Sequence, residues 1–253
     1  KPLTGQLPQA APPPPDAGMI PVRQSLRDLT DVTMRPIETV FDNEYGGFDA
    51  HSREYVIHCS INTPMPWCMI LANREFGTIV SAGGAAFTWL YNSRENKLTP
   101  WNGDPVSNPP GQDILVRDEE TSAVWRISEG DGRPGHRRTR YGMGYALFES
   151  VNQGFYQQQR IIVPPDDTVM IREVSLHNQT GMRRKISVTV WTDFVLGVHR
   201  SHTAPHILVE PDAAGDAVYA RNGYRDEFAD TVAFIAVPGI ACQYTSMRNL
   251  FHT

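Results

Sequence analysis

The hydrophobic pattern of this chain consists of short runs in which apolar and polar residues alternate or cluster. A clear example covers residues 54–61. Runs of the same kind cover residues 78–81, 85–91, 113–118, 123–127, 144–150, 155–163, 169–178, 184–193, 217–221 and 231–237. Turn residues separate the runs, as in β-proteins, and no stretch shows the long 3.6-residue period of an amphipathic helix. The pattern predicts an all-β fold, a large two-layer antiparallel β-sandwich.

The amino-terminal segment differs in composition from the rest of the chain. Residues 1–21 include a proline-rich run from Pro8 to Pro15. Such a run favours extended polyproline and does not pack into a core. We therefore expect a disordered linker over residues 1–21 and one β-sandwich domain over residues 22–253.

Composition narrows the class of protein. The chain has 253 residues, of which 40% are hydrophobic and 20% charged, and this balance is typical of a globular domain. The formal net charge of −5 argues against nucleic acid as a partner, because nucleic acids select basic surfaces. The three cysteines, Cys59, Cys68 and Cys242, are scattered and predict neither a disulfide framework nor a zinc site. No apolar stretch approaches the roughly 20 residues that span a bilayer, and no signal core opens the chain.

Candidate chemistry is concentrated between residues 43 and 106. This passage places Trp, Asn, Arg, Asp and Glu beside Pro and Gly turns. Aromatic rings stack on the apolar face of a sugar, and amide, carboxylate and guanidinium groups bind neighbouring hydroxyls. The competing interpretation is structural: Trp67, Trp89 and Trp101 would fill the core, and Arg94 and Glu95 would form an ion pair.

Four motifs in this passage carry a resemblance to a known family. Residues 92–106 read N-S-R-E-N-K-L-T-P-W-N-G-D-P-V, after G-G-F at 46–48, R-E-Y at 53–55 and T-P-M-P-W at 63–67. The chain thus resembles the amino-terminal domain of the cellobiose phosphorylase and cyclic β-1,2-glucan synthase family (glycosyltransferase 36-like), and is more similar to the glucan synthase branch. The likeness continues at Arg117-Asp118, Gly142-Met143-Gly144-Tyr145, Phe148, Asp193 to Gly197, Arg200 and Arg221-Asn222. It covers about residues 36–237.

The resemblance implies a supersandwich of the galactose-mutarotase type that precedes a catalytic (α/α)6 barrel. In the family, the barrel carries an Asp as general acid and inverts the anomeric centre. We expect that barrel to be absent from this chain, so that no catalytic residue can be assigned and the chain alone is inactive. The implied partners are a β-glucan oligosaccharide, the missing barrel and a second copy of the chain. The implied location is the bacterial cytoplasm or the cytoplasmic part of an inner-membrane protein, and no cofactor or metal is expected.

By the same resemblance, the turn at residues 92–106 and the loop at residues 140–145 hold the sugar-side or interface residues. The candidate substrate-binding residues are Trp67, Trp89, Arg94, Asn96, Trp101, Asn102, Asp104 and Tyr145. The chain departs from the family at Tyr141, where a His is typical, and after Val237, where the likeness fades. The first departure puts a polar role of position 141 in doubt.

The other clusters of polar residues in the sequence are better explained by structural roles than by catalysis or metal binding. His199, His202 and His206 would share a helix face and could bind zinc, but Pro205 breaks that helix. Asp166-Asp167 and Glu119-Glu120 are typical of turns, and the glycine-rich residues 129–138 of a solvated loop. Two alternatives to a carbohydrate-binding accessory domain stay open: a structural module without a ligand, and a self-sufficient mutarotase-like enzyme.

Overall fold

The largest element is an antiparallel sheet of seven strands, seen in a computed structural model that describes residues 34–58, 63–101, 103–104, 106–225, 227–240 and 242–246. In spatial order its strands are β1 (Thr39–Val40), β2 (Gly46–Asp49), β3 (Tyr55–His58), β9 (Arg137–Gly142), β10 (Tyr145–Asn152), β11 (Phe155–Ile162) and β12 (Ile171–Asn178). The predicted linker over residues 1–21 lies outside the described residues.

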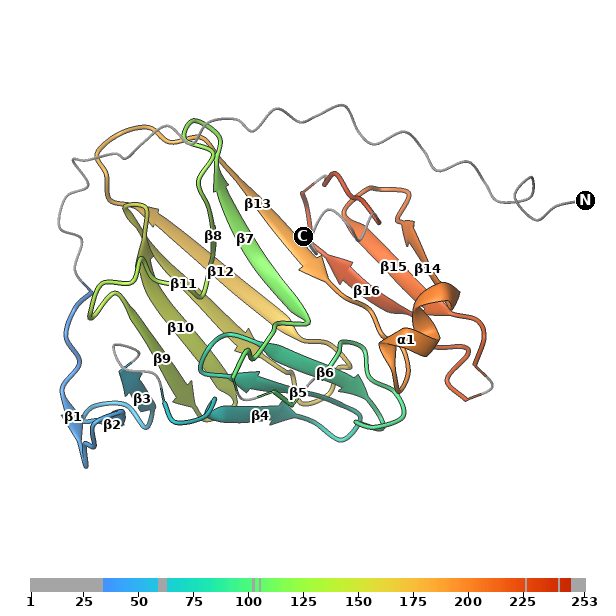
Figure 1. Ribbon diagram of the computed structural model, residues 1–253, viewed down its shortest axis with the longest axis horizontal. Coiled ribbons are helices and arrows are strands. Elements are labelled where there is room, and N and C mark those ends of the chain that lie inside the picture. The colour runs from blue at the N-terminus through green and yellow to red at the C-terminus, as the bar shows by residue number, and fades with distance from the viewer. Residues whose placement is uncertain are drawn as a thin grey trace, which may run out of the picture.

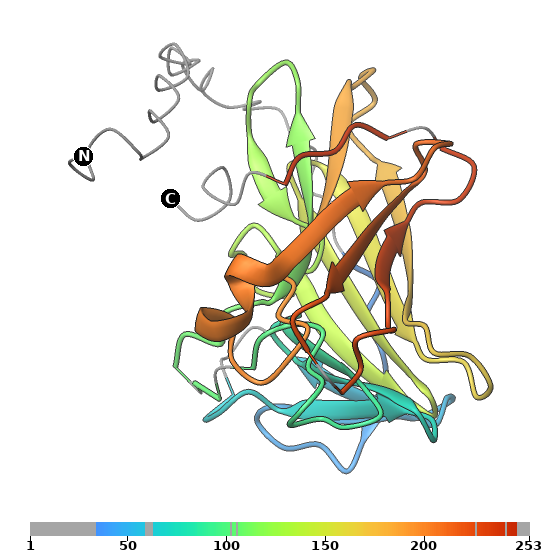
Figure 2. The same cartoon turned by 90° about the vertical axis from the view of Figure 1, so that its right-hand side faces the viewer.

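Three smaller antiparallel sheets complete the fold (Figure 1). One contains β4 (Cys68–Ala72), β5 (Phe76–Ser81) and β6 (Ala86–Leu90), and a second contains β13 (Ile186–Thr192), β7 (Gln112–Asp118) and β8 (Val124–Arg126). A third contains β14 (Ile207–Pro211), β15 (Ala217–Asn222) and β16 (Ala233–Ala236), and is preceded by the short helices α1 (Arg200–Thr203) and η2 (Ala204–His206). Seen from the side, β7 and β8 run beside the large sheet as a second layer (Figure 2). The predicted all-β sandwich is confirmed.

The strands form where side chains alternate between a buried and an outer face. In β11, Phe155, Gln157, Gln159 and Ile161 are buried, while the residues between them are more exposed. Gln157 can be buried because its amide is satisfied. The amide oxygen of Gln157 accepts a hydrogen bond from the indole of Trp125 at 2.9 Å, and its amide nitrogen donates to two carbonyls and a hydroxyl.

The β10–β11 hairpin shows how turn chemistry sets the register. Its two turn residues, Gln153 and Gly154, both have left-handed backbone angles (φ of 49° and 79°). A two-residue turn of this kind matches the right-handed twist of the strands that it joins. The resulting register pairs Asn152 with Phe155 and continues regularly to Tyr145 and Ile162.

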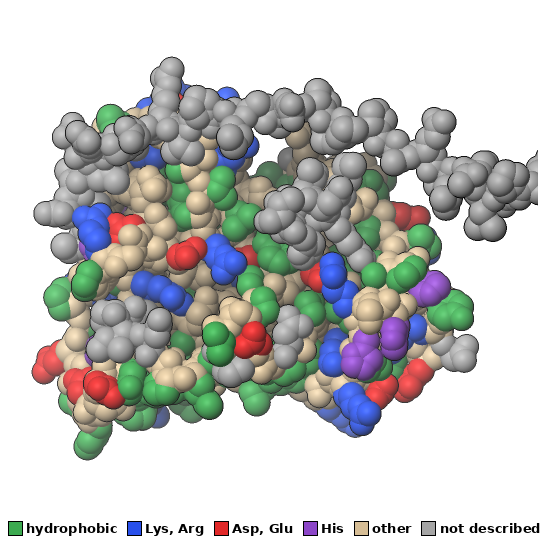
Figure 3. All heavy atoms as spheres, in the orientation of Figure 1, with side chains coloured by type: hydrophobic (Ala, Val, Ile, Leu, Met, Phe, Trp, Pro, Cys, Tyr) green, Lys and Arg blue, Asp and Glu red, His purple; other side chains and the backbone are tan. Residues whose placement is uncertain are grey.

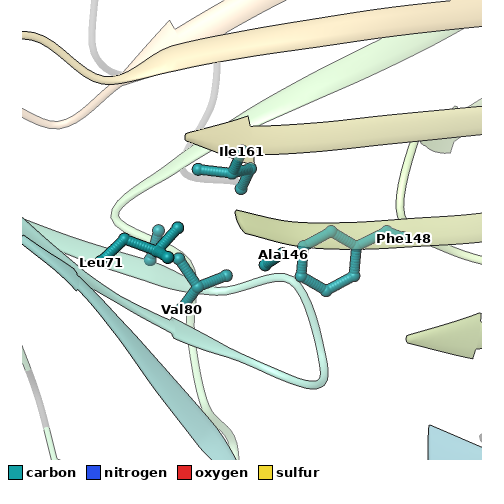
Figure 4. Close-up of a cluster of buried hydrophobic side chains, with 6 residues drawn as sticks. Leu71, Val80, Ala146, Phe148 and Ile161 are labelled. Atoms are coloured by element: carbon teal, nitrogen blue, oxygen red, sulfur yellow. The ribbon is translucent and has the colours of Figure 1, made fainter. Parts of the chain in front are cut away.

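The core consists of separate hydrophobic clusters beneath the smaller sheets. Beneath β4–β6, Leu71, Val80 and Ala86 pack against Ala146, Phe148 and Ile161 of the large sheet (Figure 4). Beneath β7 and β8, a second cluster joins Ile114, Val116, Trp125, Ile127 and Phe155. The sheet of β14–β16 instead buries its inner face against Phe194, Leu196 and Leu98. Burial of apolar surface therefore fixes where each small sheet lies.

The sequence pattern did not predict every strand, and β9 is the main example. The basic residues 129–138 were expected to form a solvated loop, but β9 begins at Arg137 and is the fourth strand of the large sheet. Arg138 is only 12% exposed because it pairs with the buried Glu149. The predicted hairpin of residues 113–118 and 123–127 is confirmed by β7 and β8.

Helical structure is minimal. In the described part of the chain, α1 and η2 contain four and three residues, and no helix there is both long and apolar enough to cross a membrane. Pro205 lies within η2, so that one continuous helix from His199 to His206 does not form.

A buried ion pair joins the β7–β8 hairpin to the β12–β13 connection. The side chains of Asp118 and Arg184 are 0% and 2% exposed, and Arg184 Nε donates to Asp118 Oδ2 at 2.6 Å. The backbone amides of Glu120 and Thr121 donate to the other carboxylate oxygen, and Arg184 also donates to the carbonyl of Gln153. Burial alone would raise the pKa of Asp118, but these hydrogen bonds and the guanidinium outweigh it and lower the pKa below its usual range.

We predict that Arg184→Met lowers the free energy of unfolding by about 3–5 kcal/mol, because it leaves the Asp118 carboxylate buried without its charged partner. Urea denaturation at pH 7 measures the change. Arg221→Met is the matched control, because Arg221 pairs with Glu210 on the surface, where both side chains are more than half exposed. The control should lose no more than about 1 kcal/mol. Equal losses in the two variants would contradict the role given to the buried pair.

The lowered pKa of Asp118 also predicts a dependence of stability on pH. A carboxyl group with a depressed pKa stabilises the fold above its unfolded pKa of about 3.9, and this contribution is lost as the pH falls through the folded pKa. Wild-type protein should therefore lose more stability than Asp118→Asn between pH 5 and the acid limit of the folded state. Parallel pH profiles of the two proteins would show that Asp118 does not contribute.

Candidate functional site

The loop between β6 and β7, residues 91–111, carries most of the motif that the sequence singles out. It leaves the sheet of β4–β6 and enters the sheet of β7, β8 and β13, so it bridges the two smaller sheets of the second layer. Between this loop and residues 65–68 lies a cavity of about 150 Å³. Its lining residues are Met65, Pro66, Cys68, Ala85, Ala86, Pro100, Trp101, Gly103, Asp104, Asn108 and Pro109. We call this cavity the Trp101 pocket.

Trp101 supplies the aromatic wall of the pocket. Its side chain is 44% exposed, although one part of the indole contacts Phe87, with ring centroids 5.4 Å apart. Phe87 is buried and contacts Trp89 at the same separation. The indole of Trp101 is therefore held from one side and remains available to a ligand from the other.

Asp104 supplies a fixed acceptor at the same pocket. Its carboxylate accepts hydrogen bonds from the Ser107 hydroxyl at 2.5 Å and the Val106 amide at 2.8 Å. These bonds hold the pKa of Asp104 below its usual range, so the group is ionised at neutral pH. In the same turn, the backbone amide of Asn108 donates to the carbonyl of Asp104 at 3.1 Å, and its side chain donates to the Ser81 hydroxyl at 2.8 Å. Asn102, the predicted binding residue between Trp101 and Asp104, lies outside the described residues.

The size and chemistry of the pocket limit what it can do. A cavity of about 150 Å³ accommodates one six-membered ring, as an apolar cavity of that size accommodates benzene. Asp104 is the single carboxylate among its described lining residues. Hydrolysis of a glycosidic bond normally requires two carboxyl groups, whereas the described lining contains the one of Asp104.

Trp89 and Asn96 lie apart from the pocket wall and have structural partners. The indole of Trp89 covers Gly77, where an added Cβ would lie 2.3 Å from the ring, so only glycine fits there. Asn96 is 1% exposed, donates to the carbonyl of Leu90 at 3.1 Å and accepts from Arg225 at 2.9 Å.

Arg94 and Trp67 occupy two further environments. The Arg94 side chain is 84% exposed, and its Nε lies 3.3 Å from the Glu95 carboxylate, in the ion pair that the structural interpretation expected. The ring of Trp67 contacts Tyr45 and Tyr55, with centroids 5.6 and 6.1 Å away. The hydroxyl of Tyr141 donates to the carbonyl of Trp67 at 2.9 Å. Position 141, where the family typically has His, thus keeps a polar role.

Tyr145 lies on the face of the large sheet that points away from the core, since its neighbour Ala146 is in the core. Its hydroxyl donates to Glu54 at 2.5 Å, and the guanidinium of Arg160 lies 4.6 Å from its ring centroid. Burial and the adjacent Glu54 raise the pKa of Tyr145. The structure therefore does not bring Tyr145 together with Trp101 and Asp104.

A charged network surrounds Tyr145, and sequence reasoning missed it. Arg138 binds both oxygens of the buried Glu149 at 2.5 and 3.0 Å, and the hydroxyl of Tyr156 donates to the same carboxylate at 2.5 Å. Burial and this hydrogen bond raise the pKa of Tyr156 to about 12. Arg140, expected in a loop, lies in β9 and pairs with Asp49, Glu54 and Glu149. The members of this charged network come from strands that lie far apart in sequence, so no local sequence motif identifies the network.

Within the part of the chain that the structure describes, the other candidate clusters have structural contacts of their own. His199 contacts His202 edge to face, while His206 stacks on Tyr224 with centroids 4.1 Å apart. Figure 3 shows imidazoles grouped on the surface near α1. Within the described ranges, no three His, Cys, Asp or Glu side chains are placed to hold a metal ion. Glu119-Glu120 begins the β7–β8 turn, and Asp166-Asp167 lies between β11 and β12, as the pattern predicted.

Comparison with known proteins agrees with the fold and the motifs. Residues 53–252 match the supersandwich domain of glycosyl hydrolase 94. The cyclic beta-(1,2)-glucan synthase NdvB of Rhizobium meliloti is 34% identical over 237 residues, which are 92% of this chain and 8% of the synthase. The N,N'-diacetylchitobiose phosphorylases of Vibrio furnissii and Vibrio proteolyticus are 26% and 29% identical, over 60% and 64% of this chain and 19% and 21% of their own lengths.

The chain thus spans a small part, 8% to 21%, of the length of each of these relatives. The match covers well over half of the chain, including every strand of the second layer. On these grounds, the chain belongs to the glycosyl hydrolase 94 family and contains its supersandwich domain.

Proposed function

We propose that this domain binds part of a β-linked gluco-oligosaccharide in the Trp101 pocket and does not itself catalyse a reaction. The observation that carries the proposal is the half-exposed indole of Trp101 beside the ionised Asp104, in a cavity the size of one ring. An aromatic face with a few fixed polar groups is the usual form of a site that orients a polar ligand. The names of the relatives, a β-1,2-glucan synthase and two chitobiose phosphorylases, support a β-linked sugar as the ligand.

In this proposal the chemistry belongs to a catalytic barrel outside this chain. Among the described lining residues, the pocket offers one carboxylate and not the two of a glycosidase, which argues against a self-sufficient enzyme. The sandwich would hold one end of the glucan while the barrel acts on the other. A location in the bacterial cytoplasm, or in the cytoplasmic part of an inner-membrane protein, stays a prediction.

A second candidate function is that of an interface module. The outer face of the sheet of β14–β16 exposes three large apolar side chains, Leu208 (57%), Tyr219 (41%) and Phe234 (49%). Tyr219 and Phe234 are directly paired across β15 and β16. Apolar groups that gather on one face mark an interaction surface, and either the barrel or a second copy of the chain would suit it.

We predict that Trp101→Ala abolishes saturable binding of gluco-oligosaccharides, because it removes the only aromatic ring among the described residues of the pocket wall. Isothermal titration calorimetry with β-1,2- and β-1,4-linked oligosaccharides measures the binding. Tyr219→Ala is the control, since its ring is similarly exposed but lies on the sheet of β14–β16. Wild-type affinity in Trp101→Ala, or no binding by folded wild-type protein, would contradict the proposal and favour the interface module.

A further inference from the structure

A second group of exposed aromatic rings lies beyond the other end of β6. Ala86, at the start of this strand, lines the Trp101 pocket, and Tyr91 directly follows its end. Five residues of extended strand place the two positions roughly 17 Å apart. Tyr91 is 55% exposed, and its ring lies nearly parallel to that of Phe228, with centroids 6.3 Å apart. On the same loop after β15, Tyr224 is 77% exposed and stacks on His206. We call these four residues the Tyr91 platform.

Arg225 fixes the platform to the N-S-R-E-N turn. One guanidinium nitrogen donates to Asn96 Oδ1 at 2.9 Å and to the carbonyl of Leu196 at 3.0 Å, and another donates to the carbonyl of Glu95 at 2.6 Å. The same guanidinium lies 5.2 Å from the ring centroid of Phe228. Two segments about 130 positions apart in sequence are thereby held together. The Trp101 pocket does not explain why the N-S-R-E-N turn contains a buried Asn96. Its bond to Arg225 does, because that bond anchors the platform.

The backbone of the platform is strained at both stacked rings. Tyr91 and Phe228 have φ angles of 60° and 62°, in the left-handed region that bulky residues rarely adopt. Each such conformation costs about 1–3 kcal/mol and persists only where the surroundings impose it. Here the two rings stack on each other and the guanidinium of Arg225 lies over the Phe228 ring, so that both residues are held by contacts while Tyr91 stays exposed.

The charges near the platform favour a neutral ligand. Arg94 is paired with Glu95, and Arg225 is occupied by backbone and amide oxygens. Glu227 and Asp230, on the loop itself, are exposed. An anionic ligand would meet these two exposed carboxylates, while the guanidinium of Arg225 is already occupied. A pyranose has an apolar face for stacking and carries no charge.

We propose that the Tyr91 platform is a second carbohydrate-binding surface, which stacks glucosyl units of a long, neutral β-linked glucan away from the Trp101 pocket. The proposal extends the proposed function from one sugar ring to a glucan chain, but the platform does not require the pocket. The proposal explains the N-S-R-E-N turn, Arg225 and the strained rings together, as parts of one binding surface.

The test measures binding of two probes to the full chain by calorimetry: sophorose, the β-1,2-linked disaccharide of glucose, and a long linear β-1,2-gluco-oligosaccharide. Tyr224→Ala should weaken binding of the long oligosaccharide about tenfold, as the loss of one stacking ring does, and leave sophorose binding unchanged. Tyr224→Trp should restore the affinity for the long oligosaccharide. Tyr91→Gly is the second variant, because glycine suits the left-handed backbone and so removes the ring without cost to the fold.

Wild-type affinity for the long oligosaccharide in both Tyr224→Ala and Tyr91→Gly would overturn the proposal, and so would equal losses for the two probes. If those variants instead change the association state measured by light scattering and leave glucan binding intact, the platform is a protein-binding surface and the proposal is wrong. The pocket is tested separately. If wild-type protein binds the long oligosaccharide through Tyr224 but does not bind sophorose, the proposal for the Trp101 pocket fails and that for the platform stands.

Discussion

The inner face of the seven-stranded sheet must be covered, and the way it is covered determines where every candidate site lies. Two small sheets share this task, one built from β4–β6 and the other from β7, β8 and β13. Each buries its own apolar cluster, so each is anchored independently by the hydrophobic effect. The loop between β6 and β7 has to cross from one sheet to the other, and it carries Trp101, Asp104 and Asn96. The Trp101 pocket lies on that crossing, and the Tyr91 platform lies where the start of the same loop meets the loop after β15.

Two groups of charged side chains in this domain are buried together with partners that satisfy them. Asp118 and Arg184 are held by several donors and acceptors, and Glu149 lies beneath Arg138 and Tyr156. On the outer face of the large sheet, the charged side chains of β9 and β10 pair with one another. The exposed aromatic residues differ from these charged groups, because much of the surface of Trp101 and Tyr224 is in contact with water. This contrast is the physical reason for assigning binding to the loops and stability to the strands.

Much of the fold could be predicted from the sequence, but less of the site. Strands such as β13 alternate apolar and polar residues, and this pattern identified them correctly. β9 was missed because Arg137, Arg138 and Arg140 resemble a solvated segment, and only their pairing with Glu149 and Glu54 shows otherwise. The motif correctly drew attention to residues 92–106. It could not separate the exposed Trp101 from the buried Asn96, because that difference depends on contacts with Phe87 and with Arg225, 129 positions away.

The central claim is that the sandwich binds a sugar through Trp101, and two-dimensional ¹H–¹⁵N NMR tests it most directly. The chain has five tryptophans, each with one indole N–H signal. On titration with sophorose, the Trp101 signal should shift saturably, while that of Trp125, whose indole is bound to the buried Gln157, should not move. If the Trp101 signal stays fixed while the protein remains folded, the pocket does not bind the sugar and the account is wrong.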